Sequence, residues 1–541
     1  MGIYKKIYTA QEARTKLLEG VNIVADAVKI TLGAKGRNVA IKQFHGPTRI
    51  TKDGVSIARS IQLKDEASNM GANLISWNAM FTAEGAGDGT TTSTVLAQAI
   101  ANAGMKYVIS GMNPIQIKKG IDLGVHTVIN YLDSIKTPVK GYDQIKQVAT
   151  VSANGDLEMG GKVAEAVEKM GVDGAIIIEE SKVSKSELEL EIIEGIQFKA
   201  GFSNPFFINV PERASCELHN PHIIVIDNDL MDMKDTMEGL QAMAPTGRPI
   251  FIICRDIMDN IEEVLIHSKM KAGLKVCVVK VVEGSDVPLV SNLLQDIAAR
   301  TGTEVISRAN QVSLAKQMKQ PDGIEFFGTC SKIIITKDKT RIIGGEANVN
   351  AMQDRIKIYE DQLKKAEFSN LKEEAKICLG RLRSGIAVLR AGGNTEVEMK
   401  ERRDRMEDAM YSSLAAVEDG VVPGGGVALF NASLLVSKLT NKNRDINAGI
   451  RILEEALRAP LYQICKNAGL NAEEIAAYLK LKNKVSLGFD VVHEKYIDML
   501  QRGIVDAAKV TKRALNDAAS IAGLILTTET IIFDDEEEKK N

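Results

Sequence analysis

The sequence has few cysteines, few aromatic residues and no long apolar run. Its six cysteines are scattered and form no Cys-x-x-Cys pair, which favours free thiols in a reducing compartment over a disulfide framework. No apolar stretch reaches the length of a membrane span, and the first residues contain no apolar segment of the secretory type. We therefore expect a cytoplasmic protein that has no membrane partner.

The sequence also lacks an excess of charge of either sign. Its 68 Lys and Arg residues nearly balance its 71 Asp and Glu residues, and the formal net charge is -3. This balance argues against a nucleic-acid partner. A hydrophobic share of 45% is that of a globular protein, and 541 residues are enough for about three domains.

Two standard ligand motifs are missing. The best match to a Walker A loop, residues 155–162, has a glycine spacing one residue too long and is followed by Val163 instead of a hydroxyl residue. His219 and His222 stand three residues apart, but no Cys or carboxylate pair joins them at ligand spacing. A metal site at these histidines stays open, and any phosphate must be bound by other loops.

Residues 87–92, Gly-Asp-Gly-Thr-Thr-Thr, are the most informative segment that is present. Glycines let a backbone approach a ligand closely, and a following helix offers free N–H groups to phosphate. Asp88 is a hard oxygen ligand of the kind that binds Mg²⁺. The segment is equally compatible with an ordinary glycine-rich turn capped by threonine, so the residues alone leave both interpretations open.

Further segments favour the phosphate site. Residues 31–38 form a second glycine-rich loop, residues 51–54 place Asp53 beside a glycine, and residues 421–426 end in three glycines after an acidic helical stretch. With residues 111–114, 152–154, 396–400 and 509–511, these motifs run through essentially the whole chain. The sequence thereby resembles the GroEL-type group I chaperonins, the 60-kDa chaperonin family, as a regular or a divergent member.

The apolar pattern divides the chain into helical and mixed blocks. Spacing over residues 11–32 predicts a helix, and short β-branched runs predict strands at 175–179, 188–193, 223–226, 250–253 and 276–282. We expect a multidomain α/β and α protein. The resemblance implies a helical equatorial domain (1–134 and 419–541), an intermediate hinge domain (135–194 and 386–418) and an α/β apical domain (195–385).

The resemblance also assigns a nucleotide site. The residues that would contact ATP are Thr31, Leu32, Gly33, Lys52, Asp88, Gly89, Thr90, Thr91, Thr92, Gly425, Asp490, Val492, Ile504 and Asp506. Asp88 would bind Mg²⁺, whereas Thr31, Lys52 and Thr91 match the region where the family holds K⁺. Asp490 stands where the family commonly has Asn, which adds a negative charge near the base or ribose.

Hydrolysis requires an oriented water molecule. The resemblance implies that Asp408 activates this water, with Asp53 alongside, and that Asp408 acts only when the intermediate domain closes. Taken by itself, Asp408 in an acidic helical stretch is better interpreted as a solvated carboxylate.

The resemblance places a client-binding surface in the apical domain, at Phe202, Phe206, Phe207, Met237, Leu240 and Ile266. Methionine suits surfaces that bind many partners, although spacing alone also fits a stripe packed into the core. Glu262 and His267 stand where the family usually shows apolar residues, which predicts weaker capture of denatured proteins.

The function that the resemblance implies is an ATPase that folds non-native polypeptides in a homo-oligomeric, heptameric ring closed by a co-chaperonin lid of the GroES type. A divergent paralogue with weak general folding activity, acting as a specialised binding or scaffold protein, is the alternative. A small-molecule kinase would use similar loops, but the sequence shows no signature of one.

Overall fold

A computed structural model describes residues 5–42, 48–171, 175–181, 188–281, 290–307, 313–320, 323–365, 375, 377–382 and 385–534. The chain divides into two compact units. The first comprises Met1–Val172, Ile178–Leu190 and Leu389–Asn541, and the second comprises Asp173–Ile177 and Glu191–Val388. The further division into equatorial, intermediate and apical domains stays a prediction.

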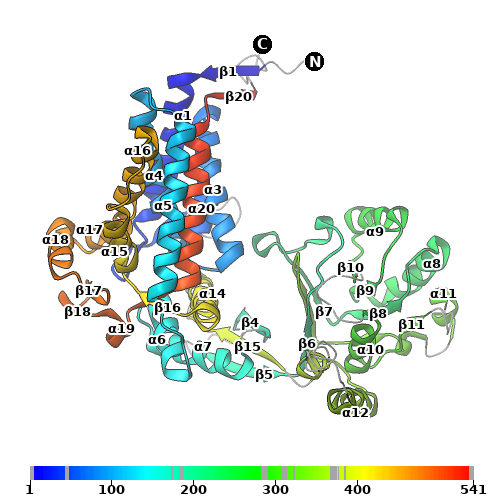
Figure 1. Ribbon diagram of the computed structural model, residues 1–541. Helices are drawn as coiled ribbons and strands as arrows, with labels where there is room; N and C mark the ends of the chain where they lie inside the picture. Colours follow the sequence, from blue (N-terminus) through cyan, green and yellow to red (C-terminus); the bar gives the residue numbers. More distant parts are fainter. Residues whose placement is uncertain are drawn as a thin grey trace. The chain divides into compact units, whose positions relative to one another are not determined.

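Long helices that run side by side form the core of the first unit (Figure 1). They are α1 (Ala10–Lys29), α3 (Glu66–Ala86), α4 (Thr90–Ile109), α5 (Pro114–Ile135), α16 (Arg444–Ala456) and α20 (Ala508–Thr527). Their inward faces carry apolar side chains at helical spacing, such as Val21, Ile75, Leu96, Ile121 and Ile525, all fully buried. The helix predicted over 11–32 is confirmed as α1.

Glycines allow two pairs of these helices to pack very closely. A Cβ atom at Gly20 of α1 would lie 1.8 Å from the carbonyl oxygen of Ser68 in α3. A Cβ atom at Gly449 of α16 would lie 2.0 Å from the carbonyl oxygen of Ile117 in α5. Neither position can hold a larger residue without separating the helices, so glycine sets the helix spacing here.

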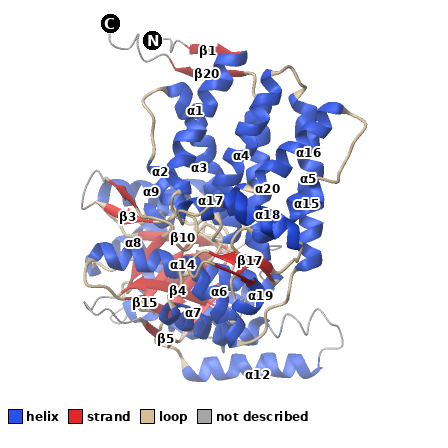
Figure 2. Ribbon diagram, turned by 90° about the vertical axis from the view of Figure 1, so that its left-hand side faces the viewer, coloured by secondary structure: helices blue, strands red, loops and turns tan. Residues whose placement is uncertain are grey.

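Shorter elements surround these helices. The helices are α2 (Gly54–Ser60), α6 (Tyr142–Ser152), α7 (Leu157–Met170), α14 (Glu396–Asp419), α15 (Val427–Val436), α17 (Ala459–Asn467), α18 (Ala472–Lys482) and α19 (Met499–Arg502). The strand pairs are β2 (Val39–Ile41) with β3 (Arg49–Thr51), β16 (Val421–Pro423) with β19 (Val505–Ala507), and β17 (Leu487–Asp490) with β18 (Lys495–Asp498), all antiparallel. Beyond one end of the helices, β1 (Lys5–Thr9) pairs antiparallel with β20 (Thr530–Asp534) (Figure 2).

The second unit is built on a parallel sheet in the order β10-β9-β8-β11, with the short β12 (Gly328–Thr329) antiparallel to β8. Its strands are β8 (His222–Asp227), β9 (Ile250–Cys254), β10 (Val276–Lys280) and β11 (Ile306–Ser307). The strands β8, β9 and β10 are continuous apolar runs, as expected for strands covered on both faces. Helices α8 (Met233–Met243), α9 (Asp259–Ala272), α10 (Val290–Thr301), α11 (Leu314–Gln317) and α12 (Val349–Lys365) belong to this unit.

Two more sheets complete the fold. An antiparallel sheet of the second unit has the order β6 (Gly195–Phe198), β14 (Thr340–Ile343), β13 (Lys332–Ile335), β7 (Cys216–His219). The other sheet has three strands in the order β4 (Ala175–Glu180), β15 (Ile386–Ala391), β5 (Glu189–Ile193). The sequence boundaries between the two units lie within these strands. All five predicted strands are confirmed, although β5 begins at Glu189 and β10 ends at Lys280; residue 282 lies outside the described residues.

Candidate functional site

The start of helix α4 offers unpaired backbone donors to a ligand. Its N-cap residue, Gly89, has a positive φ of 84° and no side-chain cap, and the first intrahelical bond runs from the Ser93 N–H to the Gly89 carbonyl oxygen. The N–H groups of Thr90, Thr91 and Thr92 in the first turn therefore have no intrahelical acceptor. Together with the positive end of the helix dipole, they form an anion-binding position.

A second predicted loop lies against this helix start. The hydroxyl oxygens of Thr31, just after α1, and Thr91 are 3.3 Å apart. The side-chain amide of Asn467 in α17 donates to the carbonyl oxygens of Lys29 and Leu32, both at 2.9 Å, and so fixes the loop from its outer side. The structure thus brings together two glycine-rich loops that are separated by more than fifty residues.

The loop that carries Lys52 and Asp53 reaches the same place. A Cβ atom at Gly54 would lie 2.8 Å from the hydroxyl oxygens of both Thr90 and Thr91. Asp53 caps helix α2 by accepting from the N–H groups of Val55, at 3.1 Å, and Ser56, at 3.0 Å. These bonds hold its carboxylate in a fixed position beside the start of α4.

Helix α14 contacts the loop that carries Gly87 and Asp88 from another side. The Ser412 hydroxyl donates to Asp88, and a Cβ atom at Gly87 would collide with the ring of Tyr411. Asp408, one turn earlier on α14, lies within electrostatic reach of Asp88 and Asp53. The three carboxylates predicted to act together are therefore neighbours in the fold.

The electrostatics of this group favour a cation. Burial, followed by repulsion from Asp88 and Asp53, raises the pKa of Asp408 well above its usual value. Burial also raises the pKa of Asp88, against hydrogen bonds from Ser412, Gly89 and Ser152 that lower it. Carboxylates that repel one another in a recessed place are stabilised by a positive ion.

The residues fit a magnesium ion that is held mainly by phosphate. No group of three His, Cys, Asp or Glu side chains in the described ranges converges as a metal site. Mg²⁺ is commonly bound by one or two carboxylates together with substrate phosphates and water. Asp88, beside the N–H groups that would hold those phosphates, is in the right place to be that carboxylate.

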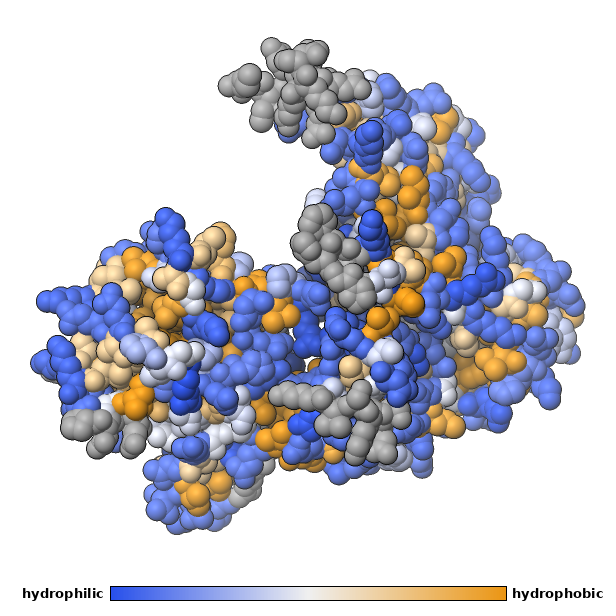
Figure 3. All heavy atoms as spheres, turned by 180° about the vertical axis from the view of Figure 1, so that it is seen from behind, coloured by the Kyte–Doolittle hydropathy of each residue, from blue (hydrophilic) through white to orange (hydrophobic). Residues whose placement is uncertain are grey.

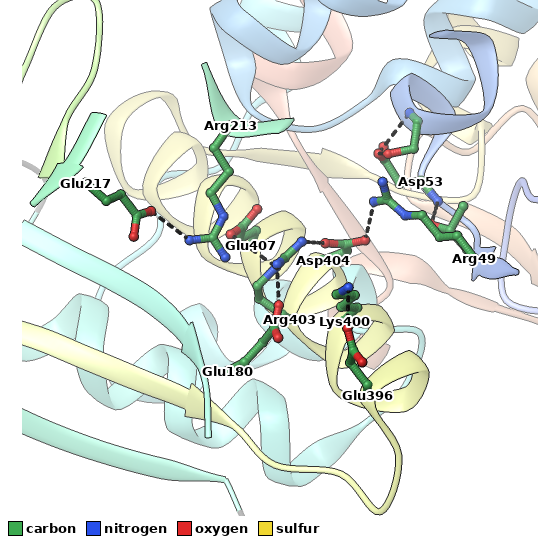
Figure 4. A network of polar contacts seen from close by, with 12 residues as sticks. Arg49, Asp53, Glu180, Arg213, Glu217, Glu396, Lys400, Arg403, Asp404 and Glu407 are labelled. Atoms are coloured by element: carbon green, nitrogen blue, oxygen red, sulfur yellow. Dashed lines mark hydrogen bonds and ion pairs between the residues drawn. The ribbon is translucent and has the colours of Figure 1, made fainter. Parts of the chain in front are cut away.

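Helix α14 is fixed in this position by an ion-pair network (Figure 4). Asp404 accepts from Arg49 at 2.8 Å and from Arg403 at 2.7 Å, and Arg403 also pairs with Glu180 at 2.6 Å. These groups are half-buried or buried, which strengthens their attraction relative to surface pairs. Sequence reasoning missed Arg49, Asp404 and Ser412, because contacts between distant segments leave no local pattern.

The predicted ribose side is formed by β16, β19 and a third glycine run. Val422 pairs with Asp506 across the two strands, and a Cβ atom at Gly424 would lie 3.0 Å from Asp506 Oδ1. Burial, with a smaller contribution from Asp88, raises the pKa of Asp506 to about 7. Gly426 then begins α15 with a positive φ of 77° and without a side-chain cap. Asp506 and Gly425 are thus grouped with a second uncapped helix start.

Asp490 makes local hydrogen bonds, and its role beside a nucleotide stays a prediction. Its carboxylate accepts from the Val492 N–H at 2.9 Å, from the His493 N–H at 3.3 Å and pairs with His493 Nδ1 at 2.7 Å. Although burial alone would raise its pKa, the bonds from His493 and Val492 lower it. The residue therefore stabilises the β17–β18 turn, from which Val492 projects with 53% of its surface exposed.

The predicted client-binding residues separate into exposed and buried ones. Phe206 is 62% exposed, and Phe202, Met237 and Ile266 are half-buried. Phe207 and Leu240 are 0% and 1% exposed, because both pack into the core of the parallel sheet. The prediction of a binding surface at Phe207 and Leu240 is wrong for this conformation, and the interpretation of part of the stripe as core is right.

Histidines 219 and 222 form no metal site. His222 is 2% exposed, and neither of its ring nitrogens has a hydrogen-bond partner, so it is a buried core residue. His219 lies exposed at the end of β7. The cysteines are all buried free thiols, as predicted.

The surface of the first unit carries apolar side chains between polar ones (Figure 3). Trp77 and Phe81, one turn apart on α3, are 52% and 46% exposed, and Leu524 on α20 is 51% exposed. Exposed apolar side chains of this size are typical of interaction surfaces. In the described ranges, no helix is both long enough and apolar enough to cross a membrane.

The fold is that of a chaperonin of the GroEL type. The chain belongs to the TCP-1/cpn60 chaperonin family, whose model matches residues 24–536. A similar solved structure is that of the chaperonin gp146 from the bacteriophage EL 2 (Pseudomonas aeruginosa), in the presence of ATP-BeFx. It has a TM-score of 0.64 and 23% identity, and the match covers 98% of this chain and 99% of that chain. This likeness supports the fold.

Proposed function

We propose that the protein is an ATP-dependent ring chaperonin that binds non-native polypeptides and promotes their folding in an enclosed cavity. The observation that carries this proposal is the uncapped start of α4, flanked by Asp53, Asp88 and Asp408. Unpaired N–H groups beside repelling carboxylates suit a polyphosphate bound with a divalent cation. The solved chaperonin with ATP-BeFx supports nucleotide as the ligand.

Each residue of the site has a role that its position supports. Asp88 would hold Mg²⁺, which supplies charge neutralisation for phosphoryl transfer. The N–H groups and hydroxyls of residues 89–92 would bind the β- and γ-phosphates, and the loop of residues 31–33 would face the α-phosphate. Asp506 would accept from the ribose hydroxyls, with Gly425, Asp490, Val492 and Ile504 around the ribose and base. Oxygens of Thr31, Lys52 and Thr91 would hold K⁺.

Asp408 is the group best suited to accept a proton from the attacking water. Burial, followed by the repulsion of neighbouring acids, raises its pKa, and a carboxylate with a raised pKa is a stronger base. Asp53 is committed to capping α2 and would act through its charge. Because α14 carries Asp408, the Arg49–Asp404 ion pair would help to hold the Asp408 carboxylate close to the phosphates.

The remaining parts of the proposal concern assembly. Exposed apolar residues such as Trp77 and Phe81 would lie in contacts between copies, in a homo-oligomeric, heptameric ring. A co-chaperonin lid of the GroES type and non-native clients would bind the second unit, near Phe202, Phe206, Met237 and Ile266. We propose a cytoplasmic location.

A divergent chaperonin with weak general folding activity is the second candidate. The burial of Phe207 and Leu240 and the acidic Glu262 in the client region favour it, since they reduce the apolar surface that a generic client can reach.

Negative-stain imaging combined with phosphate release tests the proposal. We expect seven-fold rings, a change of ring shape with ATP, a cap when the lid protein is added, and steady phosphate release. Asymmetric monomers that release no phosphate would contradict it. Rings that turn over ATP but fail to refold a denatured test protein would select the second candidate.

A further inference from the structure

Glu262 on helix α9 is an enclosed acid without a partner. Its side chain is 9% exposed, and its Oε1 atom is buried and accepts no hydrogen bond. A buried charged oxygen that lacks a partner is costly, since nothing replaces its lost hydration. Residues of this kind call for a ligand or a structural reason, and no side chain in the described ranges donates a hydrogen bond to Glu262 Oε1.

Three basic side chains of this part of the chain bond to groups other than Glu262. Arg255 pairs with Asp227 at 2.6 Å, and Lys280 pairs with Asp256 at 3.3 Å. Lys269, on the same helix, donates to the carbonyl oxygens of Phe206 and Ile208 at 2.8 and 3.0 Å. These three basic groups are therefore engaged elsewhere, and Glu262 Oε1 accepts no hydrogen bond from the described residues.

Helices α8 and α9 begin side by side, and this places Glu262 next to the predicted client surface. The segments before them are joined by an isolated parallel bridge, with the Leu230 N–H bonded to the Asp256 carbonyl at 2.7 Å and the Met258 N–H bonded to the Leu230 carbonyl at 3.2 Å. Figures 1 and 2 show both helices on the same side of the parallel sheet. On α9, Glu262 stands one turn from Met258 and one turn from Ile266.

The surface around the two helix starts combines methionine with acidic groups. Met231 and Met258 are 61% and 43% exposed, and Met237 is half-buried. Asp256 and Asp259 are exposed on the segment that leads into α9 and at the start of its first turn. A cation that approaches Glu262 would meet flexible apolar side chains and negative charge together.

We propose that this surface, the α8–α9 groove, selects client segments in which a lysine or arginine lies among apolar residues. The ammonium or guanidinium would donate to Glu262 Oε1, while its aliphatic stem and neighbours pack on Met237 and Ile266. This inference rests on the proposed client-binding role of the second unit. It adds a charge rule, which is a preference for clients with a basic residue among apolar ones. A charge-assisted hydrogen bond to an enclosed oxygen corresponds to about tenfold or more in affinity.

Two labelled peptides that differ at one position test the proposal. Both are apolar dodecapeptides, with lysine at the centre of one and norleucine, its uncharged counterpart, in the other. Fluorescence anisotropy with the full-length protein gives their dissociation constants. We expect the lysine peptide to bind about tenfold more tightly at low salt, and this advantage to shrink as salt rises.

Two nearly isosteric variants locate the effect. Glu262→Gln should abolish the preference for lysine, whereas Glu263→Gln, which changes the exposed neighbouring acid, should leave it intact. Equal binding of the two peptides to the parent, or an unchanged preference in Glu262→Gln, overturns the charge rule while leaving the groove as a client site. Failure of both peptides to bind overturns the client role itself.

Discussion

Ser412 of α14 donates a hydrogen bond to Asp88, a residue 324 positions earlier in the chain. This bond joins the helix that carries the proposed base to the loop that would hold the metal. Because one helix supplies both Ser412 and Asp408, a movement of α14 changes the metal ligand and the base together. Such a link would couple nucleotide chemistry to conformation.

Removing the proposed base should separate ATP binding from hydrolysis. Asp408→Ala takes away the proton acceptor but leaves Asp88 and the N–H groups at the start of α4. We expect phosphate release at saturating ATP to fall about a hundredfold or more, with nearly unchanged nucleotide affinity. Glu418→Gln, at an exposed carboxylate near the end of α14, should behave as the parent does. Hydrolysis at the parental rate in Asp408→Ala would remove Asp408 from the mechanism.

Removing the proposed magnesium ligand should abolish the stabilisation that nucleotide provides. Asp88→Ala deletes the carboxylate beside the phosphate position, so Mg-ATP should no longer raise the melting temperature. Glu84→Ala, which removes an exposed carboxylate near the end of α3, serves as the control and should keep the Mg-ATP shift. An equal shift in Asp88→Ala and the parent would show that the ion binds elsewhere.

Charge in the α8–α9 groove should set how much denatured protein is captured. Met237→Glu places a carboxylate on half-buried apolar surface, and we expect at least tenfold weaker retention of an unfolded model protein. Met270→Glu, at a methionine that is 69% exposed near the end of α9, is the matched control. Glu262→Leu should strengthen the capture of segments that carry no basic residue. Unchanged retention in both Met237→Glu and Glu262→Leu would place the client site elsewhere.

Buried His222 should make the protein sensitive to acid. Burial, with a smaller contribution from Arg248, lowers its pKa from 6.5 to about 4. The unfolded chain therefore binds the proton more readily than the folded one between these values. Stability is retained above pH 6.5 and is lost as the pH falls toward 4, by on the order of 3 kcal/mol at most. Denaturation midpoints of the parent and His222→Leu against pH measure this. Parallel curves would show that His222 does not titrate in this way.

Local pattern predicted much of the fold. The strands β8, β9 and β10 are apolar runs whose sequence alone marks them, and α1 follows helical spacing. The grouping of Thr31, Asp53 and Asp88 followed from resemblance, since nothing local connects three short loops. Burial was harder to predict. The resemblance placed Leu240 and Phe207 on the client-binding surface, yet both pack into the core of the parallel sheet.

The network of Arg49, Asp404 and Arg403 could not be read from the sequence. It depends on the packing of α14 against β3, and charged residues are abundant throughout α14. The isolated oxygen of Glu262 is equally invisible, because its environment is set by the side-by-side start of two helices. Such features are properties of the packing between segments that lie far apart in the chain.

The central claim is that ATP hydrolysis at the site of Asp88 and Asp408 drives folding. The most direct measurement is the activity recovered from a chemically denatured test enzyme, with a GroES-type lid and either ATP or a non-hydrolysable analogue. We predict recovery well above the spontaneous yield with ATP, little recovery with the analogue, and little recovery for Asp408→Ala with ATP. Equal recovery in all three conditions, or none above the spontaneous yield, would contradict the account.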